Sequence, residues 1–237
     1  MKILTAHQPA YLPWCGLMHK IAIADVYVYM DDVKYSKSDK FINRNYIKNP
    51  NGKQLLTLPL KTGGSDNFLV KDLEIDDPRK HLKAHFNNIR QNYIKSAFFK
   101  MYETQIKEIY DRPYLYLKDI SYDLLVFIAQ ALGIQTQFVK ATNLEIGTSK
   151  NQYLIDLCKK FNCNMYIFGA QGRDYADAEI WSENNISIEF QDYKHPEYKQ
   201  MFGGFEPYLS VLDLLFNHGP ESLFILTNDN LKKEDLI

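Results

Sequence analysis

Two kinds of hydrophobic pattern alternate along the chain. Short apolar runs rich in β-branched and aromatic residues predict strands at residues 2–7, 26–30, 136–139, 165–168 and 186–190. Apolar positions at helical spacing predict helices between them, at residues 16–25, 149–161 and 177–184. Because strand–helix–strand order makes successive strands parallel, the sequence predicts a mainly parallel sheet with flanking helices.

The segment between residues 30 and 136 departs from this alternation. Residues 41–48 and 53–60 predict two strands joined by a turn, where Asn51 and Gly52 tolerate the positive φ of tight hairpins. Residues 70–75 predict another strand. Helical periodicity follows at residues 81–93, 98–110 and 114–132, with Asp77 and Pro78 at the expected start and Gly133 at the expected end. We therefore expect an α/β fold with an inserted β-hairpin and a helical middle segment.

The C-terminal part predicts a helix at residues 210–217, another from residue 221, and a loose polar tail from about residue 228. Internal repeats and Gly/Ser/Pro-rich linkers are absent from the sequence. Residues 1–237 are therefore expected to form one domain.

Composition limits the kinds of partner. The 237 residues carry 28 basic and 29 acidic side chains, a net charge of -1, so no global field favours nucleic acid or an anionic membrane. The longest apolar run is far shorter than the ~20 residues of a membrane span. The three cysteines fit no disulfide framework, and the N-terminal residues do not resemble a signal peptide. We expect a cytoplasmic protein with a small-molecule substrate, no nucleic-acid partner and no membrane span.

The densest group of polar and aromatic residues follows the first predicted strand, at residues 7–16. Ligands of parallel sheets bind beyond the carboxyl ends of the strands, and this loop also leads into a helix N-terminus, which attracts anions. His7 is a candidate acid, base or donor beside a phosphate or carboxylate. The alternative is a proline-rich turn that packs Tyr11 and Trp14 into the core.

A second candidate group follows the second predicted strand. Asp31 and Asp32 could hold magnesium or orient hydroxyl groups, and Arg44, between two asparagines, could bind phosphate or carboxylate. A solvated charged loop is the alternative for the aspartates.

Two later groups carry similar chemistry. Glycines 169 and 172 would let a ligand approach the backbone closely beside Arg173, although an ordinary turn would also use them. Asp213 lies three residues after Ser210 on one face of a predicted apolar helix; Ser210 fits a helix cap better, and both interpretations stay open for Asp213. His81 and His85 lack the glutamate of the zinc-protease motif, so we predict no metal site.

These groups together resemble the WbqC-like family over nearly the whole chain. The first matching block contains His7, Gln8, Pro9, Tyr11, Pro13, Trp14 and Gly16, followed by Lys20 and Asp25. The later blocks contain Asp32, Lys37, Asn43, Arg44, Asn45, Leu56, Thr57, Pro59, Gly169, residues 172–175, His195, Pro196, Tyr198, Gln200, Ser210, Asp213, Asn217 and Gly219. Lys34 departs from the pattern, because the family often has glutamine there.

The resemblance implies a role in surface-polysaccharide (O-antigen and capsule) biosynthesis and in modifying a sugar precursor. We expect a transferase that acts on a nucleotide-sugar, with transfer of a small acyl or aminoacyl group as the first hypothesis. Its expected catalytic residues are His7, Asp32 and His195. Its expected substrate-binding residues are Gln8, Tyr11, Trp14, Lys20, Lys37, Asn43, Arg44, Asn45, Arg173, Tyr175, Tyr198, Gln200 and Asp213.

In this hypothesis His7 is the general base, Arg44, Arg173 and the helix at Gly16 hold phosphate, and Asp32 or Asp213 orients His7 or the acceptor. Two alternatives stay open. One is a nucleotidyl transferase with an HxGH-like layout, in which Gly16 and His19 stand near a helix N-terminus. The other is a non-catalytic protein that binds a nucleotide-sugar. The sequence names no cofactor.

Overall fold

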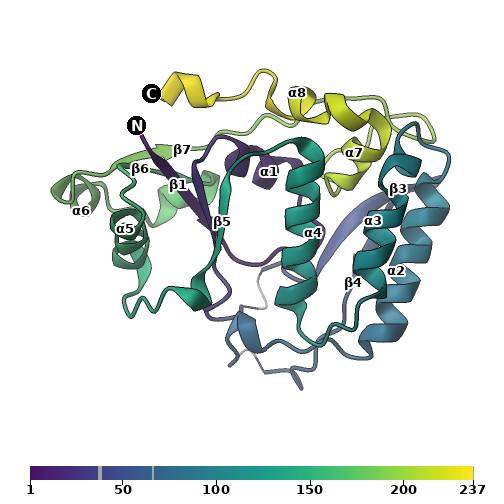
Figure 1. Cartoon of the computed structure of the whole chain (residues 1–237), viewed down its shortest axis with the longest axis horizontal. Helices are drawn as coiled ribbons and strands as arrows, with labels where there is room; N and C mark the ends of the chain where they lie inside the picture. Colours follow the sequence, from purple (N-terminus) through teal and green to yellow (C-terminus); the bar gives the residue numbers. More distant parts are fainter. Residues whose placement is uncertain (37–38, 66, 237) are drawn as a thin grey trace.

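The predicted parallel sheet is confirmed. A computed structural model describes residues 1–36, 39–65 and 67–236. Its strands are β1 (Ile3–His7), β2 (Val26–Tyr29), β5 (Gln137–Lys140), β6 (Met165–Phe168) and β7 (Ser187–Phe190). All pair in parallel in the order β5-β2-β1-β6-β7 (Figure 1).

Alternating side chains of the strands enter two different cores. Val26 and Val28 pack with α5 (Lys150–Lys160) and α6 (Ala178–Glu183), whereas Tyr27 and Tyr29 pack with α1 (Cys15–Ala22) and α4 (Leu117–Leu132). Helices therefore cover both faces, which explains why the strands read as nearly continuous apolar runs.

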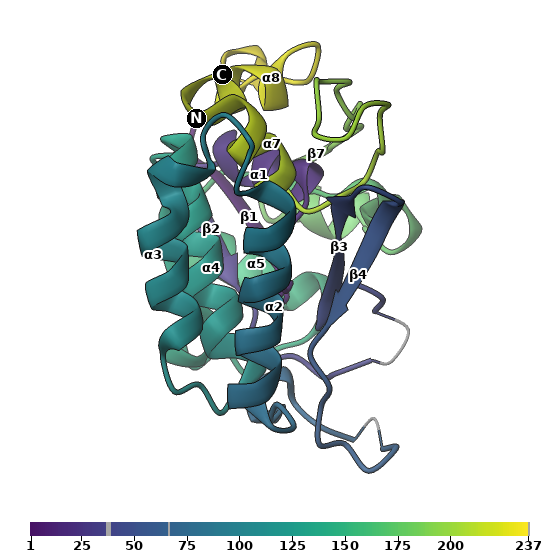
Figure 2. The same cartoon turned by 90° about the vertical axis from the view of Figure 1, so that its right-hand side faces the viewer.

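The inserted middle segment is also confirmed. β3 (Arg44–Asn49) and β4 (Gly52–Thr57) form a separate antiparallel hairpin, and Gly52 has the positive φ of 110° expected at its turn. α2 (Pro78–Tyr93), α3 (Phe99–Asp111) and α4 pack side by side, with the hairpin beside α2 (Figure 2). Asp77 caps α2 by accepting a hydrogen bond from the Lys80 N–H, and Gly133 ends α4 with a φ of 78°.

Two expectations about local structure were wrong. Residues 70–75 form no regular strand: Val70–Asp72 is a short 3₁₀ helix, because Val70 and Leu73 are buried three residues apart and so share one face of its turn. The tail after α7 (Leu212–His218) and α8 (Ser222–Thr227) is not loose over residues 228–236. Leu236 is buried in a small core with Ile3, which brings the C-terminal residues beside the start of β1 (Figure 1).

The strand order creates a switch point between β1 and β6. The chain leaves β1 towards β2 on one side and later returns to β6 on the other, while α1 and α5 lie on opposite faces. The loops after β1 and β6 consequently diverge, and such divergence opens a crevice at the carboxyl edge of a sheet.

Among the described residues, no helix has both the length and the apolar character needed to cross a membrane.

Candidate functional site

A cleft with a volume of about 1180 Å³ lies at this carboxyl edge. Segments that follow all five parallel strands contribute to its wall. The three loops expected from the sequence, after β1, β2 and β6, are joined by the segments after β5 and β7. Of the expected site residues, eight line the cleft: His7, Gln8, Trp14, Lys20, Asp32, Asn45, Tyr175 and His195.

His7, the last residue of β1, is held as a neutral imidazole. Its Nδ1 lies 2.7 Å from the carbonyl oxygen of Gln8. Because that oxygen can only accept, Nδ1 carries the proton and Nε2 is the basic nitrogen. Burial, and secondarily the positive charge of Lys20, lowers the pKa of His7 to about 4. The Trp14 ring packs edge-on against the imidazole, with centroids 5.4 Å apart.

Lys20 reaches the same wall from α1. Its Nζ donates to the carbonyl oxygen of Ala6, in β1, at 3.1 Å. The residue is only 5% exposed, and burial lowers the pKa of its ammonium group to about 8. Its neighbour His7 is neutral, so this wall presents one buried positive charge.

The two adjacent aspartates have different environments. Asp31 is buried and accepts hydrogen bonds from the backbone N–H and the hydroxyl of Thr142, which ties β2 to the segment after β5. Asp32 lines the cleft, where the Tyr153 hydroxyl of α5 donates to its carboxylate at 3.0 Å. Burial, and secondarily the charge of Asp31, raises the pKa of Asp32. Of these two adjacent aspartates, Asp32 is therefore the one that can meet a ligand in the cleft.

His195 lines the cleft with both of its nitrogens bonded to backbone. Nδ1 lies 2.9 Å from the carbonyl oxygen of Pro196, and Nε2 accepts the N–H of Tyr208 at 3.3 Å. Its ring also packs against that of Tyr208, which lines the cleft as well. This bonding favours a role in positioning Tyr208 over a role in proton transfer.

Several other expected site residues lie outside the cleft wall. Tyr11 is fully buried, and its hydroxyl is bonded to the side chains of His85 and Tyr110. The Asn43 amide donates to the Leu58 carbonyl, and Arg44 donates to the Lys40 carbonyl.

Arg173 forms a bidentate ion pair with Asp192 at 2.8 and 2.9 Å on the surface. Lys37 lies outside the described residues.

Tyr198, Gln200 and Asp213 belong to a second region, behind the hairpin. Asp213 is fully buried and accepts a hydrogen bond from the Tyr93 hydroxyl at 2.9 Å. Gln200 accepts from Lys48, a buried residue of β3. Tyr198 is buried and packs its ring against His195, which connects this region to the cleft.

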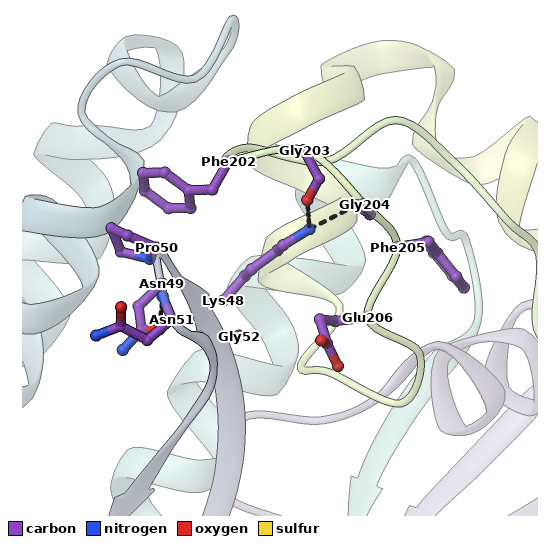
Figure 3. Close-up of a pocket in the computed structure, with 10 residues that line it drawn as sticks. All are labelled: Lys48, Asn49, Pro50, Asn51, Gly52, Phe202, Gly203, Gly204, Phe205 and Glu206. Carbon is purple, nitrogen blue, oxygen red and sulfur yellow. Dashed lines mark hydrogen bonds between the residues drawn. The ribbon is translucent and has the colours of Figure 1, made fainter.

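A smaller pocket of about 290 Å³ lies in this second region, between the turn of the hairpin and residues 202–206 (Figure 3). Lys48 extends into it, and its Nζ donates to the carbonyl oxygens of Gly203 and Gly204 at 2.8 and 2.7 Å. With the bond to Gln200, Lys48 has an acceptor for each of its N–H groups. The charge at this pocket is thus satisfied by the protein itself.

Comparison with known proteins confirms the family that the sequence resembles. The model of the WbqC-like protein family matches residues 8–225. The chain belongs to the WbqC-like protein family. It is 34% identical over 224 residues to the uncharacterized protein Rv1507c of Mycobacterium tuberculosis (strain ATCC 25618 / H37Rv), covering 94% of this chain and 96% of that protein. No solved structure matches the chain.

The cleft of this WbqC-like protein is positively charged and rich in aromatic side chains. Among the described residues, its charged lining consists of four lysines and two aspartates: Lys20, Lys34, Lys40, Lys150, Asp32 and Asp39. Its aromatic lining, beyond the residues already placed, includes Phe41, Tyr153, Tyr166, Phe168 and Tyr193. Such walls suit a ligand that combines anionic groups with flat or sugar rings.

Sequence reasoning missed part of this lining. Gln191 and Tyr193 directly follow β7, so the rule about carboxyl ends of strands would have found them had it been applied to every strand. Tyr153 carried no such signal, because its role depends on the packing of α5 beside Asp32. Gly172 approaches Phe168 so closely that an added Cβ would lie 2.4 Å from the Cβ of Phe168, which gives a packing reason for this glycine.

The described residues contain no group of three or more histidine, cysteine, aspartate or glutamate side chains that could hold a metal ion.

Proposed function

We propose that this WbqC-like protein is a transferase that moves a small acyl or aminoacyl group onto a nucleotide-sugar bound in the cleft, as a step of surface-polysaccharide biosynthesis. One observation carries the proposal: a neutral His7, whose tautomer leaves Nε2 basic, lies in the wall of a large cleft at the switch point of the sheet.

The size and lining of the cleft support a nucleotide-sugar. Its 1180 Å³ exceeds the roughly 300–1,000 Å³ typical of small-molecule pockets, so an acceptor and a donor could bind together. The excess of lysines suits phosphate groups, and the aromatic walls suit a base and a sugar ring.

The chemistry follows from the position of the base. An amine or hydroxyl of the sugar attacks the carbonyl carbon of an activated ester or thioester. A C–N or C–O bond forms, the bond to the leaving oxygen or sulfur breaks, and His7 Nε2 takes the proton of the nucleophile and passes it to the leaving group. Asp32, held by Tyr153, accepts a hydrogen bond from the sugar and orients it.

The environment of His19 weighs against nucleotidyl transfer. His19 is fully buried; its Nε2 is bonded to the Leu231 carbonyl at 2.9 Å and its Nδ1 to the Gln191 amide at 2.6 Å. Neither ring nitrogen is then free to stabilise a phosphorus transition state, as the HxGH-like layout would require.

The test incubates the purified protein with UDP- and dTDP-linked amino sugars and with acetyl-coenzyme A or an aminoacyl thioester, and follows the mass of the nucleotide-sugar. We expect one pair to gain the acyl group. His7→Gln should lower turnover by about 10²–10⁴-fold while affinity for the nucleotide-sugar changes little. His81→Gln, a substitution on α2 outside the cleft, is the matched control.

Loss of turnover in both variants, or in neither, would contradict the role of His7. Binding of a nucleotide-sugar without turnover of any donor would favour the non-catalytic alternative.

A further inference from the structure

The strongest remaining feature of the cleft is the incomplete bonding of Lys20. An ammonium group has three N–H donors, and within the described part of the chain Nζ of Lys20 has one acceptor, the carbonyl oxygen of Ala6. The residue is buried, with 5% of its surface exposed. A buried charge without a counter-charge is costly, so proteins normally pair it.

The cleft itself does not supply the counter-charge. Asp32 and Asp39 are the carboxylates among its described lining residues, and Asp32 is bonded to Tyr153. Neither aspartate forms an ion pair with Lys20 in the described part of the chain.

The surroundings of Lys20 favour an anion. Gly16 and Leu17, in the first turn of α1, line the same cleft, and this turn carries no acidic residue. The backbone N–H groups and the dipole at the start of a helix attract negative charge. His7, whose pKa is lowered in part by the charge of Lys20, is neutral and so adds no competing charge.

We propose that Lys20 is the residue that binds the phosphate of the nucleotide-sugar, and that the ligand completes the bonding of its ammonium group. This inference rests on the proposed function for the identity of the substrate. It assigns the diphosphate to the wall formed by β1 and α1, the wall that also carries His7.

The experiment measures binding without turnover. The probes are UDP and inorganic pyrophosphate, titrated by calorimetry at pH 7.5 into wild type, Lys20→Met and Lys34→Met. Lys34 also lines the cleft but is exposed, so solvent screens its charge. We expect Lys20→Met to weaken both probes by about thirtyfold or more, and Lys34→Met by less than about fivefold.

Lys20→Arg separates the charge from the fold. Above about pH 8 wild-type Lys20 loses its proton, so affinity for UDP should fall as pH rises from about 7.5 to 9, a range in which the diphosphate of UDP stays ionised. Arginine stays charged, and should bind with little pH dependence. Wild type and Lys20→Arg share every other titratable residue of the cleft, so a difference between their pH profiles of UDP affinity is due to Lys20. The shared residues are Asp32, Asp39, Lys34, Lys40, Lys150, His7, His195 and the tyrosines of the cleft.

Wild type that binds neither probe, or Lys20→Met that binds both as tightly as wild type, would overturn the inference. Failure of the proposed function looks different, because phosphate binding would then depend on Lys20 while every acyl donor gave no product. Circular dichroism and thermal unfolding establish that each variant is folded.

Discussion

Two buried lysines, Lys20 in α1 and Lys48 in β3, hold their charges in different ways. Lys20 is 5% exposed and Lys48 is 2% exposed, so both have lost nearly all of their water. Among the residues that the structure describes, Lys48 donates to three oxygen acceptors from residues 200–204, whereas Lys20 donates to one. Burial alone therefore does not distinguish the two lysines; the number of acceptors that the protein supplies does.

The two regions differ accordingly in what they can bind. Around Lys48 the protein supplies every acceptor, and the small pocket beside it follows from the path of residues 202–206 (Figure 3). Around Lys20 the large cleft leaves room for acceptors that a ligand brings. The contrast predicts opposite effects of removing each charge.

The largest effect is expected at Lys48. Lys48→Met leaves the carbonyl oxygens of Gly203 and Gly204 without a donor and removes one of the two donors to Gln200 Oε1, which keeps the N–H of Glu206. It should lower the free energy of unfolding by about 3–5 kcal/mol. Urea unfolding measures this. Lys53→Met is the control: Lys53 lies on the same hairpin with a partly exposed ion pair to Glu206 at 3.7 Å, which should contribute less than about 1 kcal/mol. If the Lys48→Met and Lys53→Met proteins were equally stable, the bonds of Lys48 would not stabilise the fold, and the contrast between Lys48 and Lys20 would be contradicted.

The next largest effect on stability is expected at His7, because burial lowers the pKa of His7 as it lowers that of Lys20. Its pKa is lowered from 6.5 to about 4, so the unfolded state binds more protons between these values and stability falls as pH drops through them. In His7→Gln the loss of unfolding free energy between pH 6.5 and 4 should be smaller than in wild type by about 3 kcal/mol. Parallel denaturation curves at several pH values would show it, and equal losses in both proteins would contradict a buried, neutral His7.

Removing Lys20 should have the opposite sign to removing Lys48. Lys20→Met replaces a buried charge lacking a counter-charge with an apolar side chain of similar length, and should raise the free energy of unfolding by about 1–3 kcal/mol in the absence of ligand. The gain should shrink above about pH 8, where the wild-type amine is neutral. A destabilised Lys20→Met would mean that Lys20 supports the fold through its bond to Ala6.

The smallest change in stability is expected at His195, which connects the cleft to the region around Lys48 through its contact with Tyr198. His195 accepts the N–H of Tyr208, and Tyr208 lines the cleft while its ring lies 6.0 Å from the ammonium group of Lys53. His195→Phe keeps an aromatic ring but loses this acceptor, so it should cost about 1 kcal/mol of stability. Affinity for UDP should weaken modestly if Tyr208 contacts the ligand. A loss of turnover as large as that of His7→Gln would instead make His195 a catalytic residue.

The sequence predicted the parts of the fold that depend on local pattern. Apolar runs located the five parallel strands, Asp77 and Gly133 located helix ends, and the turn at Gly52 located the hairpin. The loops after β1, β2 and β6 followed from the parallel order of the strands. The 3₁₀ turn at Val70–Asp72 escaped prediction, because a short segment with buried Val70 and Ile75 reads equally well as a strand.

The candidate site was less predictable, because burial and partners decide which polar side chains remain available. Asp31 and Asp32 are adjacent in sequence, yet Asp31 accepts two hydrogen bonds from Thr142, whereas Asp32 lines the cleft. Tyr11 fits the motif of the first loop equally well as a ligand-binding residue or a core residue, and its hydroxyl is bonded to His85 and Tyr110. The sequence motif includes Lys20, but it does not indicate that this lysine lacks a counter-charge. The packing of α1 against β1 reveals that.

The most direct test of the difference between the two lysines is nuclear magnetic resonance of the lysine side chains, with ¹³C at Cε and assignment by Lys20→Arg. In the free protein the Lys20 signal should titrate with a pKa of about 8. On saturation with UDP this pKa should rise by at least about one pH unit, because the phosphate favours the charged form. The chemical shift of the Lys48 Cε, measured at one pH, should be the same with and without UDP. A Lys20 signal that titrates identically with and without UDP, under conditions where UDP binds, would contradict the account.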